Sequence, residues 1–288
     1  MKKIGLIGGI TPESTILYYR ILNQLNNNFF YMLLNYLENG EYISFLDSDD
    51  EFEIDAIDNF IETIKQTKSD IVVSKFYLRN EKNELITTGG WKSENNIISN
   101  RKAIEKMYSN EITFTAWAKL YKSSVIKNSL FPEGLWFEDR PFFLQSLLNS
   151  NSISFINKPL LSIYTTKNSI TRRLISRKRI VDLQKIWEIE LEIATNEKID
   201  NEILRLICTH HISVLYETVI ILSLEKNKVN NFGELLTCFD QNISKTKLAF
   251  AIHSPSLKVK FKGYFSIVGK YFESEVIAYN SAAAQKNS

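Results

Sequence analysis

The 288-residue chain has the composition of an ordinary globular protein, with 44% hydrophobic residues, 24% charged residues and a formal net charge of +2. Net charge is −2 over residues 1–170 and +4 over residues 171–288, an asymmetry too small to indicate nucleic acid as a partner. The longest apolar helical pattern, residues 212–224, is too short to cross a bilayer and contains Glu217, so we expect no transmembrane segment.

The two cysteines, Cys208 and Cys238, stand in no metal-binding or redox spacing. This usage predicts a reducing compartment and no disulfide. The first ten residues make a poor signal peptide because three glycines interrupt their apolar run. We therefore expect a cytoplasmic location.

Residues 3–9 read as a strand that runs into a glycine turn, and Thr11 with Pro12 predicts the start of a helix that continues to about Leu25. A strand, glycine turn and helix could cradle a phosphate. The dinucleotide fingerprint requires a further glycine, which this stretch lacks.

Residues 1–25 resemble the amino terminus of the aspartate/glutamate racemase family, and we assign residues 1–27 to a racemase-like opening segment. The chemistry of that family depends on two cysteines in specific motifs. Neither Cys208, in ICTHH, nor Cys238, in LTCFD, stands in such a motif. Racemase activity is therefore not implied, and a racemase-related protein is only a distant alternative.

The most informative stretch is EYISFLDSDD, residues 41–50, where an apolar strand ends in a cluster of carboxylates. Asp47 and Asp49 can converge on one point if the chain turns as it leaves the strand. A hard divalent cation such as Mg²⁺ or Mn²⁺ would suit that point, since it takes one or two carboxylates together with phosphate oxygens.

Two other interpretations of this cluster exist. Acidic residues after a strand can form a solvated turn followed by the first turn of a helix, where the helix dipole favours them. A calcium loop would need glycine where Phe52 stands and a helix before the loop, so the sequence argues against it.

A helix is predicted over residues 54–65 and a strand over residues 70–77. In this order, the elements around GEYISFLDSDD resemble the metal-binding centre of family-2 glycosyltransferases, which have a nucleotide-sugar-binding GT-A fold. The resemblance covers about residues 36–173. It implies an α/β fold in which a partial GT-A-like sheet is flanked by helices.

Three later features extend the resemblance. The first is TAWAKLYK, residues 115–122, with Trp117 and Lys119; the second is the segment from Phe131 to Asp139; the third is residues 164–171. Taken alone, Trp117 is better explained by core packing. Glu138 and Asp139, taken alone, are better explained as acids at the start of a helix.

The resemblance implies an inverting sugar transfer from a nucleotide-diphosphate sugar to a glycan or lipid-linked acceptor in surface polysaccharide synthesis. Asp47, Asp49 and Asp50 would bind the cofactor, with Asp47 and Asp49 as ligands of Mg²⁺ or Mn²⁺. Asp139 would be the general base, and Glu138 beside it would tune its position or charge. A pair of neighbouring acids tends to raise the pKa of one member, which suits a base.

The chain departs from the family before residue 47. Only 46 residues precede Asp47, fewer than the family has at this place. None of them forms the Asp-Asp-Gly-Ser motif with which that family contacts the nucleotide. We expect a truncated core over residues 28–173 in what reads as a gene fusion. A catalytically inactive remnant that acts only as a binding module is the alternative to an active enzyme.

Residues 174–280 are predicted to be mainly helical, and residues 281–288 to form a disordered tail. One helical face carries Ile180, Leu183, Ile186, Trp187 and Leu191.

His210 and His211 fall in the same helical region, and adjacent histidines on a helix do not face one another. We interpret both as structural. Residues Lys258–Phe272 mix lysines with aromatics, a pattern that fits a peripheral contact with the inner face of a membrane but fits an ordinary packing element better.

Overall fold

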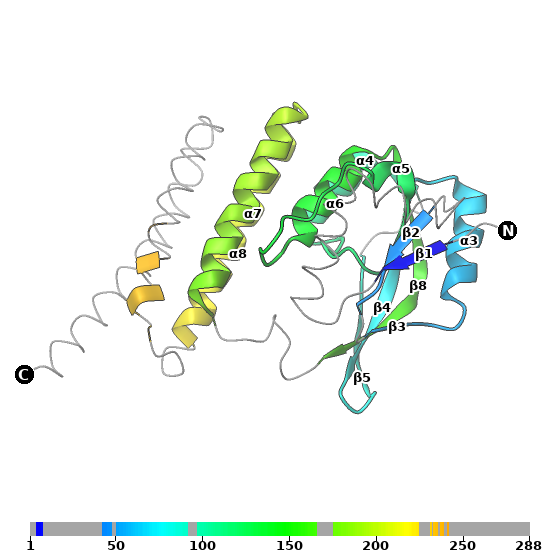
Figure 1. Cartoon of the computed structure of the whole chain (residues 1–288), viewed down its shortest axis with the longest axis horizontal. Helices are drawn as coiled ribbons and strands as arrows, with labels where there is room; N and C mark the ends of the chain where they lie inside the picture. The colour runs from blue at the N-terminus through cyan, green and yellow to red at the C-terminus, as the bar shows by residue number, and fades with distance from the viewer. Residues whose placement is uncertain are drawn as a thin grey trace, which may run out of the picture. The chain divides into compact units, whose positions relative to one another are not determined.

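The computed structural model describes residues 4–7, 42–47, 50–91, 97–165 and 175–224, together with residues 231, 233–235, 237, 238 and 241. The chain divides into two compact units, Met1–Ser169 and Ile170–Ser288, whose elements are labelled in Figure 1. The helix expected over residues 11–25, the segment Lys258–Phe272 and the tail at 281–288 lie outside the described residues. The expected domain boundaries at residues 27 and 173 stay predictions.

One mixed eight-stranded sheet forms the centre of the first unit. Its strands are β1 (Ile4–Ile7), β2 (Tyr42–Phe45), β3 (Glu51–Phe52), β4 (Ile71–Asn80), β5 (Leu85–Gly89), β6 (Ile97–Ser99), β7 (Lys119–Lys122) and β8 (Ser152–Thr165). The order is β1-β2-β7-β4-β8-β3, while β5 pairs with β4 and β6 pairs with β8. The pairings make β1, β2, β4 and β8 parallel to one another, with β7 and β3 antiparallel to them.

Helices cover both faces of this sheet, as Figure 1 shows. Helix α3 (Ala56–Thr67) lies on one face. Helices α4 (Asn100–Tyr108), α5 (Ser123–Ile126) and α6 (Asp139–Leu148) lie on the other. The predicted α/β fold class is confirmed.

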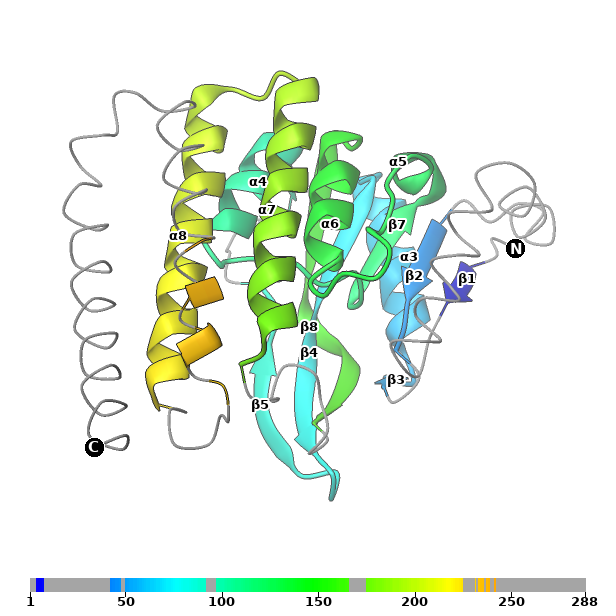
Figure 2. The ribbon, with the colours of Figure 1, turned by 60° about the vertical axis from the view of Figure 1, so that its left-hand side comes forward.

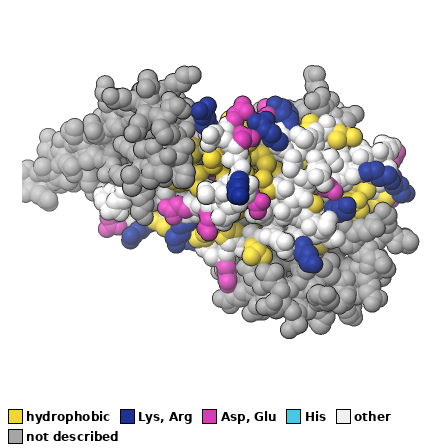
Figure 3. Space-filling model, turned by 90° about the horizontal axis from the view of Figure 1, so that it is seen from above, with side chains coloured by type: hydrophobic (Ala, Val, Ile, Leu, Met, Phe, Trp, Pro, Cys, Tyr) yellow, Lys and Arg dark blue, Asp and Glu magenta, His cyan; other side chains and the backbone are white. Residues whose placement is uncertain are grey.

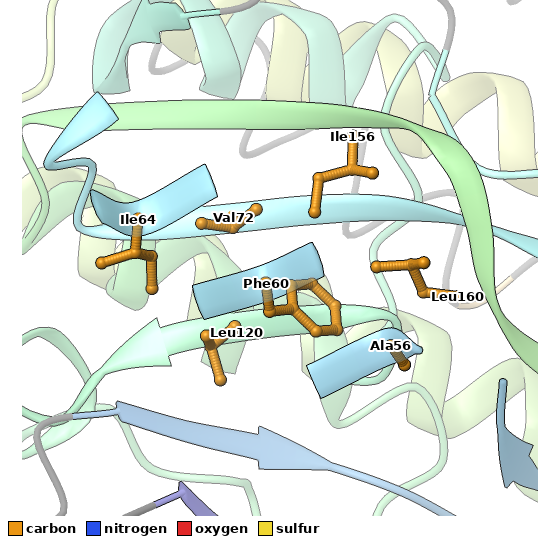
Figure 4. Close-up of a cluster of buried hydrophobic side chains, with 7 residues drawn as sticks. All are labelled: Ala56, Phe60, Ile64, Val72, Leu120, Ile156 and Leu160. Carbon is orange, nitrogen blue, oxygen red and sulfur yellow. The ribbon is translucent and has the colours of Figure 1, made fainter. Parts of the chain in front are cut away.

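Helix α3 lies within two residues of its predicted position at each end. Its residues Ala56, Phe60 and Ile64 follow at intervals of four and form one buried stripe. The helix ends at Lys68, which has a left-handed φ of 56° and donates its backbone N–H to Ile64 O at 2.8 Å. Figure 4 shows the stripe facing side chains of three strands. The complete cluster is Ala56, Phe60, Ile64, Val72, Leu120, Ile156 and Leu160.

The strand predicted at residues 70–77 is β4, and its first four residues are buried on both faces of the sheet. Val72 faces α3, so Ile71 and Val73 face α6, because successive strand residues alternate. A strand covered by helices on both sides reads as a continuous apolar run, which is how DIVVS reads in the sequence.

The second unit contains α7 (Arg177–Asn196) and α8 (Asn201–Leu224), which lie side by side in Figure 2. All five residues of the predicted apolar face of α7 are buried, so this face is confirmed. Ser176 begins the helix, since its side chain accepts a hydrogen bond from the Arg179 amide.

His210, His211, Cys208 and Cys238 are all buried, and the His211 ring stacks on Trp187 with ring centres 4.5 Å apart. Burial raises the pKa of the Cys208 thiol to about 12, so its thiolate is scarce at neutral pH. Among the described residues, no helix is both long and apolar enough to span a membrane.

Candidate active site

The first component of the site is the turn that follows β2. The Asp50 amide donates a hydrogen bond of 3.1 Å to the Asp47 carbonyl oxygen, so the chain is tied back on itself just after β2. The Asp47 side chain is exposed, while Asp49 lies outside the described residues, so its place beside Asp47 stays a prediction.

The second component is the start of α6. Asp139 is the first residue of this helix and Glu138 precedes it, so their interpretation as helix-start acids is correct for their location. The approach to the helix turns at Gly134 and Phe137, which have φ values of 75° and 66°. A left-handed φ is costly for a bulky residue such as Phe137, and such strain is concentrated at functional sites.

Aromatic packing joins these two components. Phe45 at the end of β2 meets Phe142 of α6 edge-to-face, with ring centres 5.3 Å apart. Asp47 follows Phe45 by two residues, just beyond the end of β2, and Asp139 precedes Phe142 by about one helical turn. The packing thus joins the two elements that carry these acids, and the negative charge of Asp47 raises the pKa of the Asp139 carboxyl group.

The surroundings of Asp139 raise the pKa of its carboxyl group. Burial is the main cause that raises its pKa well above the ordinary value, and the charges of Glu138 and then Asp47 raise it further. A hydrogen bond from the Ala116 amide and the charge of Lys119 oppose the rise. The sequence predicts a raised pKa from the neighbouring acid, but desolvation contributes more than Glu138 does.

The third component is the segment before β7. Trp117 forms a β-bridge with Phe45 and packs edge-to-face on Phe76 at 4.8 Å, so the packing interpretation of Trp117 is supported. Ala118, with a φ of 57°, is followed by Lys119, which is fully buried. The family resemblance includes Lys119 as a motif residue, but no pattern in the sequence predicts that this lysine is buried beside Asp139.

Asp50 points to a different neighbour. Its Oδ1 accepts a hydrogen bond of 3.1 Å from the Tyr164 amide near the end of β8. The next residue, Glu51, accepts a bond from the Tyr164 hydroxyl, and Glu53 accepts one of 2.7 Å from Ser162. Asp50 thus fastens the acidic turn to β8, and its predicted contact with a cofactor stays a prediction.

The carboxylates at this site can hold a metal ion only together with phosphate oxygens of a bound substrate. Within the part of the chain that the structure describes, no three His, Cys, Asp or Glu side chains are grouped as a metal site. A cation held by one or two carboxylates plus phosphate oxygens needs no such group. The exposed Asp47 carboxylate on its turn fits that kind of site.

The described surface shows no strong charge polarity on the face drawn in Figure 3. Acidic and basic side chains are intermixed there with hydrophobic ones.

Comparison with known proteins bears on this geometry. Residues 38–130 match the model of glycosyl transferase family 2. The chain is 27% identical over 140 residues to glycosyltransferase GlyA of Streptococcus pneumoniae, covering 46% of this chain and 20% of that protein. It is also 27% identical over 132 residues to the cholesterol galactosyltransferase of Borreliella burgdorferi, covering 41% of this chain and 36% of that protein. The chain thus spans only a minor part of the length of these curated relatives.

A solved structure, S. aureus TarS 1–349, shares the fold with a TM-score of 0.50 and 17% identity. The likeness covers 84% of this chain and 81% of that one. The family match includes Asp47, Asp49, Trp117 and Lys119 and ends before Glu138 and Asp139. Residues 38–130 are therefore similar to glycosyl transferase family 2, and the chain shares its α/β fold with TarS.

Proposed function

We propose that the chain transfers a sugar from a nucleotide-diphosphate sugar to a hydroxyl group of its acceptor, with inversion at the anomeric carbon. One observation carries this proposal: Phe45 and Phe142 pack the end of β2 against α6, and the charge of Asp47 raises the pKa of Asp139 at the start of that helix. The family match supports the donor class.

The reaction is a single displacement. The acceptor hydroxyl oxygen attacks the anomeric carbon, the bond from that carbon to the diphosphate oxygen breaks, and the hydroxyl proton passes to Asp139. A carboxylate with a raised pKa accepts this proton more readily than an ordinary aspartate does. Glu138 supports the raised pKa through its negative charge.

Asp47, together with Asp49, would hold Mg²⁺ or Mn²⁺. When bound, the ion supplies positive charge that stabilises the leaving diphosphate. The chain itself contributes a fixed position for Asp50 and β3, since the Tyr164 amide donates to Asp50 and β3 pairs with β8. Such fixation matters because small errors in position cost orders of magnitude in rate.

The proposal also includes the acceptor, but only as a chemical class. We infer a glycan or lipid-linked hydroxyl in surface polysaccharide synthesis, in the cytoplasm or at the inner face of the membrane. One relative is named for galactosyl transfer to cholesterol, a lipid, which supports an acceptor at a membrane. The peripheral contact through Lys258–Phe272 is part of the proposal and lies outside the described residues.

The test is donor turnover by the full chain. UDP release is measured with UDP-galactose, UDP-glucose and UDP-GlcNAc, with Mn²⁺ and with chelator, and with a lipid or glycan acceptor panel. We expect release with one donor and loss of release with chelator. Asp139→Asn should lower kcat by about 10²- to 10⁴-fold, the usual contribution of a general base. Asp47→Asn should weaken the metal dependence.

Asp58→Asn is the matched control, because Asp58 is an exposed carboxylate in the first turn of α3. It should retain full turnover. If Asp139→Asn turns over as fast as the wild type, the base assignment is wrong. If a donor raises the melting temperature of the wild type but is never turned over, the chain is the inactive binding module instead.

A further inference from the structure

A buried lysine lies next to the proposed base. Lys119 is the first residue of β7 and has no exposed surface. Its Nζ donates to Thr115 O at 2.6 Å, and it also lies 3.4 Å from Trp117 O. Two threonine hydroxyls complete the shell, Thr113 Oγ1 at 3.3 Å and Thr115 Oγ1 at 3.4 Å. The ammonium group therefore gathers oxygens from a single short segment, residues 113–117.

The same segment contacts the base. The Ala116 amide, which stands between the two carbonyls that Lys119 holds, donates a hydrogen bond to the Asp139 carboxylate. Tyr121 reaches the same residue from β7, since its hydroxyl donates to Ala116 O at 3.1 Å. The Lys119 Nζ also lies 4.6 Å from the centre of the Phe143 ring on α6, so it packs against the helix that begins with Asp139.

We propose that Lys119 is a positioning residue for Asp139: its ammonium group fixes the 113–117 segment so that the Ala116 amide is presented to the Asp139 carboxylate. The inference rests on the proposed function, because it assigns a role relative to the base of that reaction.

The cost of burying Lys119 argues against a role in packing alone. Desolvation lowers the pKa of Lys119 to about 7, opposed only by the charge of Asp139. An apolar side chain of similar length would fill the same space without this cost, and such replacements are often neutral or stabilising. A buried lysine whose Nζ gathers the carbonyls of a strained segment ending at Ala118, with its φ of 57°, is better explained by the amide that this segment presents to Asp139.

The experiment replaces the cation and keeps the volume. In the full chain, Lys119→Met is compared with Lys122→Met, which removes an exposed lysine from the same strand. Two readouts are taken: kcat and donor KM from UDP release, and the Ala116 amide signal in protein labelled with ¹⁵N-alanine. The proton shift and hydrogen exchange of this amide report its bond to Asp139 without any need for turnover.

We expect Lys119→Met to lower kcat by about 10- to 100-fold with little change in donor KM, as misplacement of a catalytic group does. The Ala116 amide should shift upfield and exchange faster, while Lys122→Met should change neither readout. If Lys119→Met is poorly folded, a Thr113→Val/Thr115→Val variant removes two of the acceptors and should give a smaller change of the same kind.

An unchanged Ala116 amide in a folded Lys119→Met protein would overturn the inference, whatever the enzyme does. If the wild type turns over no donor but the Ala116 amide responds as expected, the positioning contact stands and the proposed function fails. If both readouts change in Lys122→Met as strongly as in Lys119→Met, the effect is a general loss of charge and the inference is wrong.

Discussion

The two faces of the central sheet are built differently. On the α3 face the packed side chains form the apolar cluster drawn in Figure 4. On the α6 face the same strands carry buried Lys119 and Tyr121 against a helix that begins with Asp139 and buried Arg140. The two non-glycine residues with positive φ that border the site, Ala118 and Phe137, also belong to this side.

This difference indicates that the α3 face mainly stabilises the fold and that the α6 face carries the proposed reactive groups. Apolar burial is favourable by about 25 cal/mol per Å², whereas burying an ionisable group without full compensation is costly. The α3 face can therefore support the sheet while the α6 face keeps charged groups at positions that favour a reaction. Both faces depend on β7, where Lys119 and Leu120 point to opposite sides.

The largest change in stability is expected from a substitution on the α3 face. Phe60→Ala should lower the free energy of unfolding by about 3–5 kcal/mol, because Phe60 is fully buried and its loss leaves a cavity. Urea unfolding at constant protein concentration measures the change. Ile61→Ala, in the same helix at a half-buried position, is the control and should cost clearly less. Equal losses of stability in the two variants would mean that the buried cluster under α3 does not contribute more to stability than the half-buried side of the helix.

A smaller effect of opposite sign is expected from the α6 face. The folded pKa of Asp139 lies above its unfolded value of about 3.9, so the folded state binds more protons between these two values and stability falls as pH rises through that window. Asp139→Asn removes this loss. The variant should match the wild type at low pH and be more stable than it at neutral pH, with the difference growing as pH rises through the window between the unfolded and folded pKa of Asp139.

Unfolding curves of both proteins from pH 4 to pH 8 measure this difference. Asp182→Asn, on α7 in the other unit, controls for loss of a buried carboxylate and should show no such gain, since Asp182 pairs with Lys178 Nζ at 2.5 Å. A stability gain for Asp139→Asn that is the same at every pH would show that titration of Asp139 is not its source.

The smallest effect should come from a polar link between β2 and β7. Ser44 is fully buried on β2, and its hydroxyl donates to Lys119 O at 2.7 Å. Ser44→Ala should cost about 0.5–1.5 kcal/mol, the net value of one hydrogen bond. Thermal unfolding measures it, with Ser123→Ala at the start of α5 as the control. A cost above that of Phe60→Ala would reverse the order proposed for the two faces.

Helices and strands whose buried residues recur at regular spacing were predictable from the sequence. The stripe Ala56, Phe60 and Ile64 and the buried run of β4 place α3 and β4 within a few residues of their observed bounds. Local pattern suffices here, because helix and strand burial repeat along the chain. The apolar face of α7 was predictable for the same reason.

The candidate site was not predictable from such patterns. Asp47 and Asp139 are on elements joined by packing between Phe45 and Phe142, which are 97 positions apart, and only the family resemblance anticipated a connection between the two acids. Asp50 shows the same limit: its partner, the Tyr164 amide, is 114 positions away. The burial of Lys119 leaves no local signal either, because one lysine in TAWAKLYK looks like any solvated one.

The pairing of β1 with β2 has a consequence for how such chains can arise. β1 lies in the stretch that resembles a racemase, yet it pairs in parallel register with β2, from Ile4 opposite Tyr42 to Ile7 opposite Phe45. Strand pairing through main-chain hydrogen bonds does not depend on side-chain sequence, since every residue other than proline offers the same amide and carbonyl groups. The edge of this sheet can therefore pair with strands of different side-chain sequence, so a change of the β1 sequence need not alter β2, the strand that leads to Asp47.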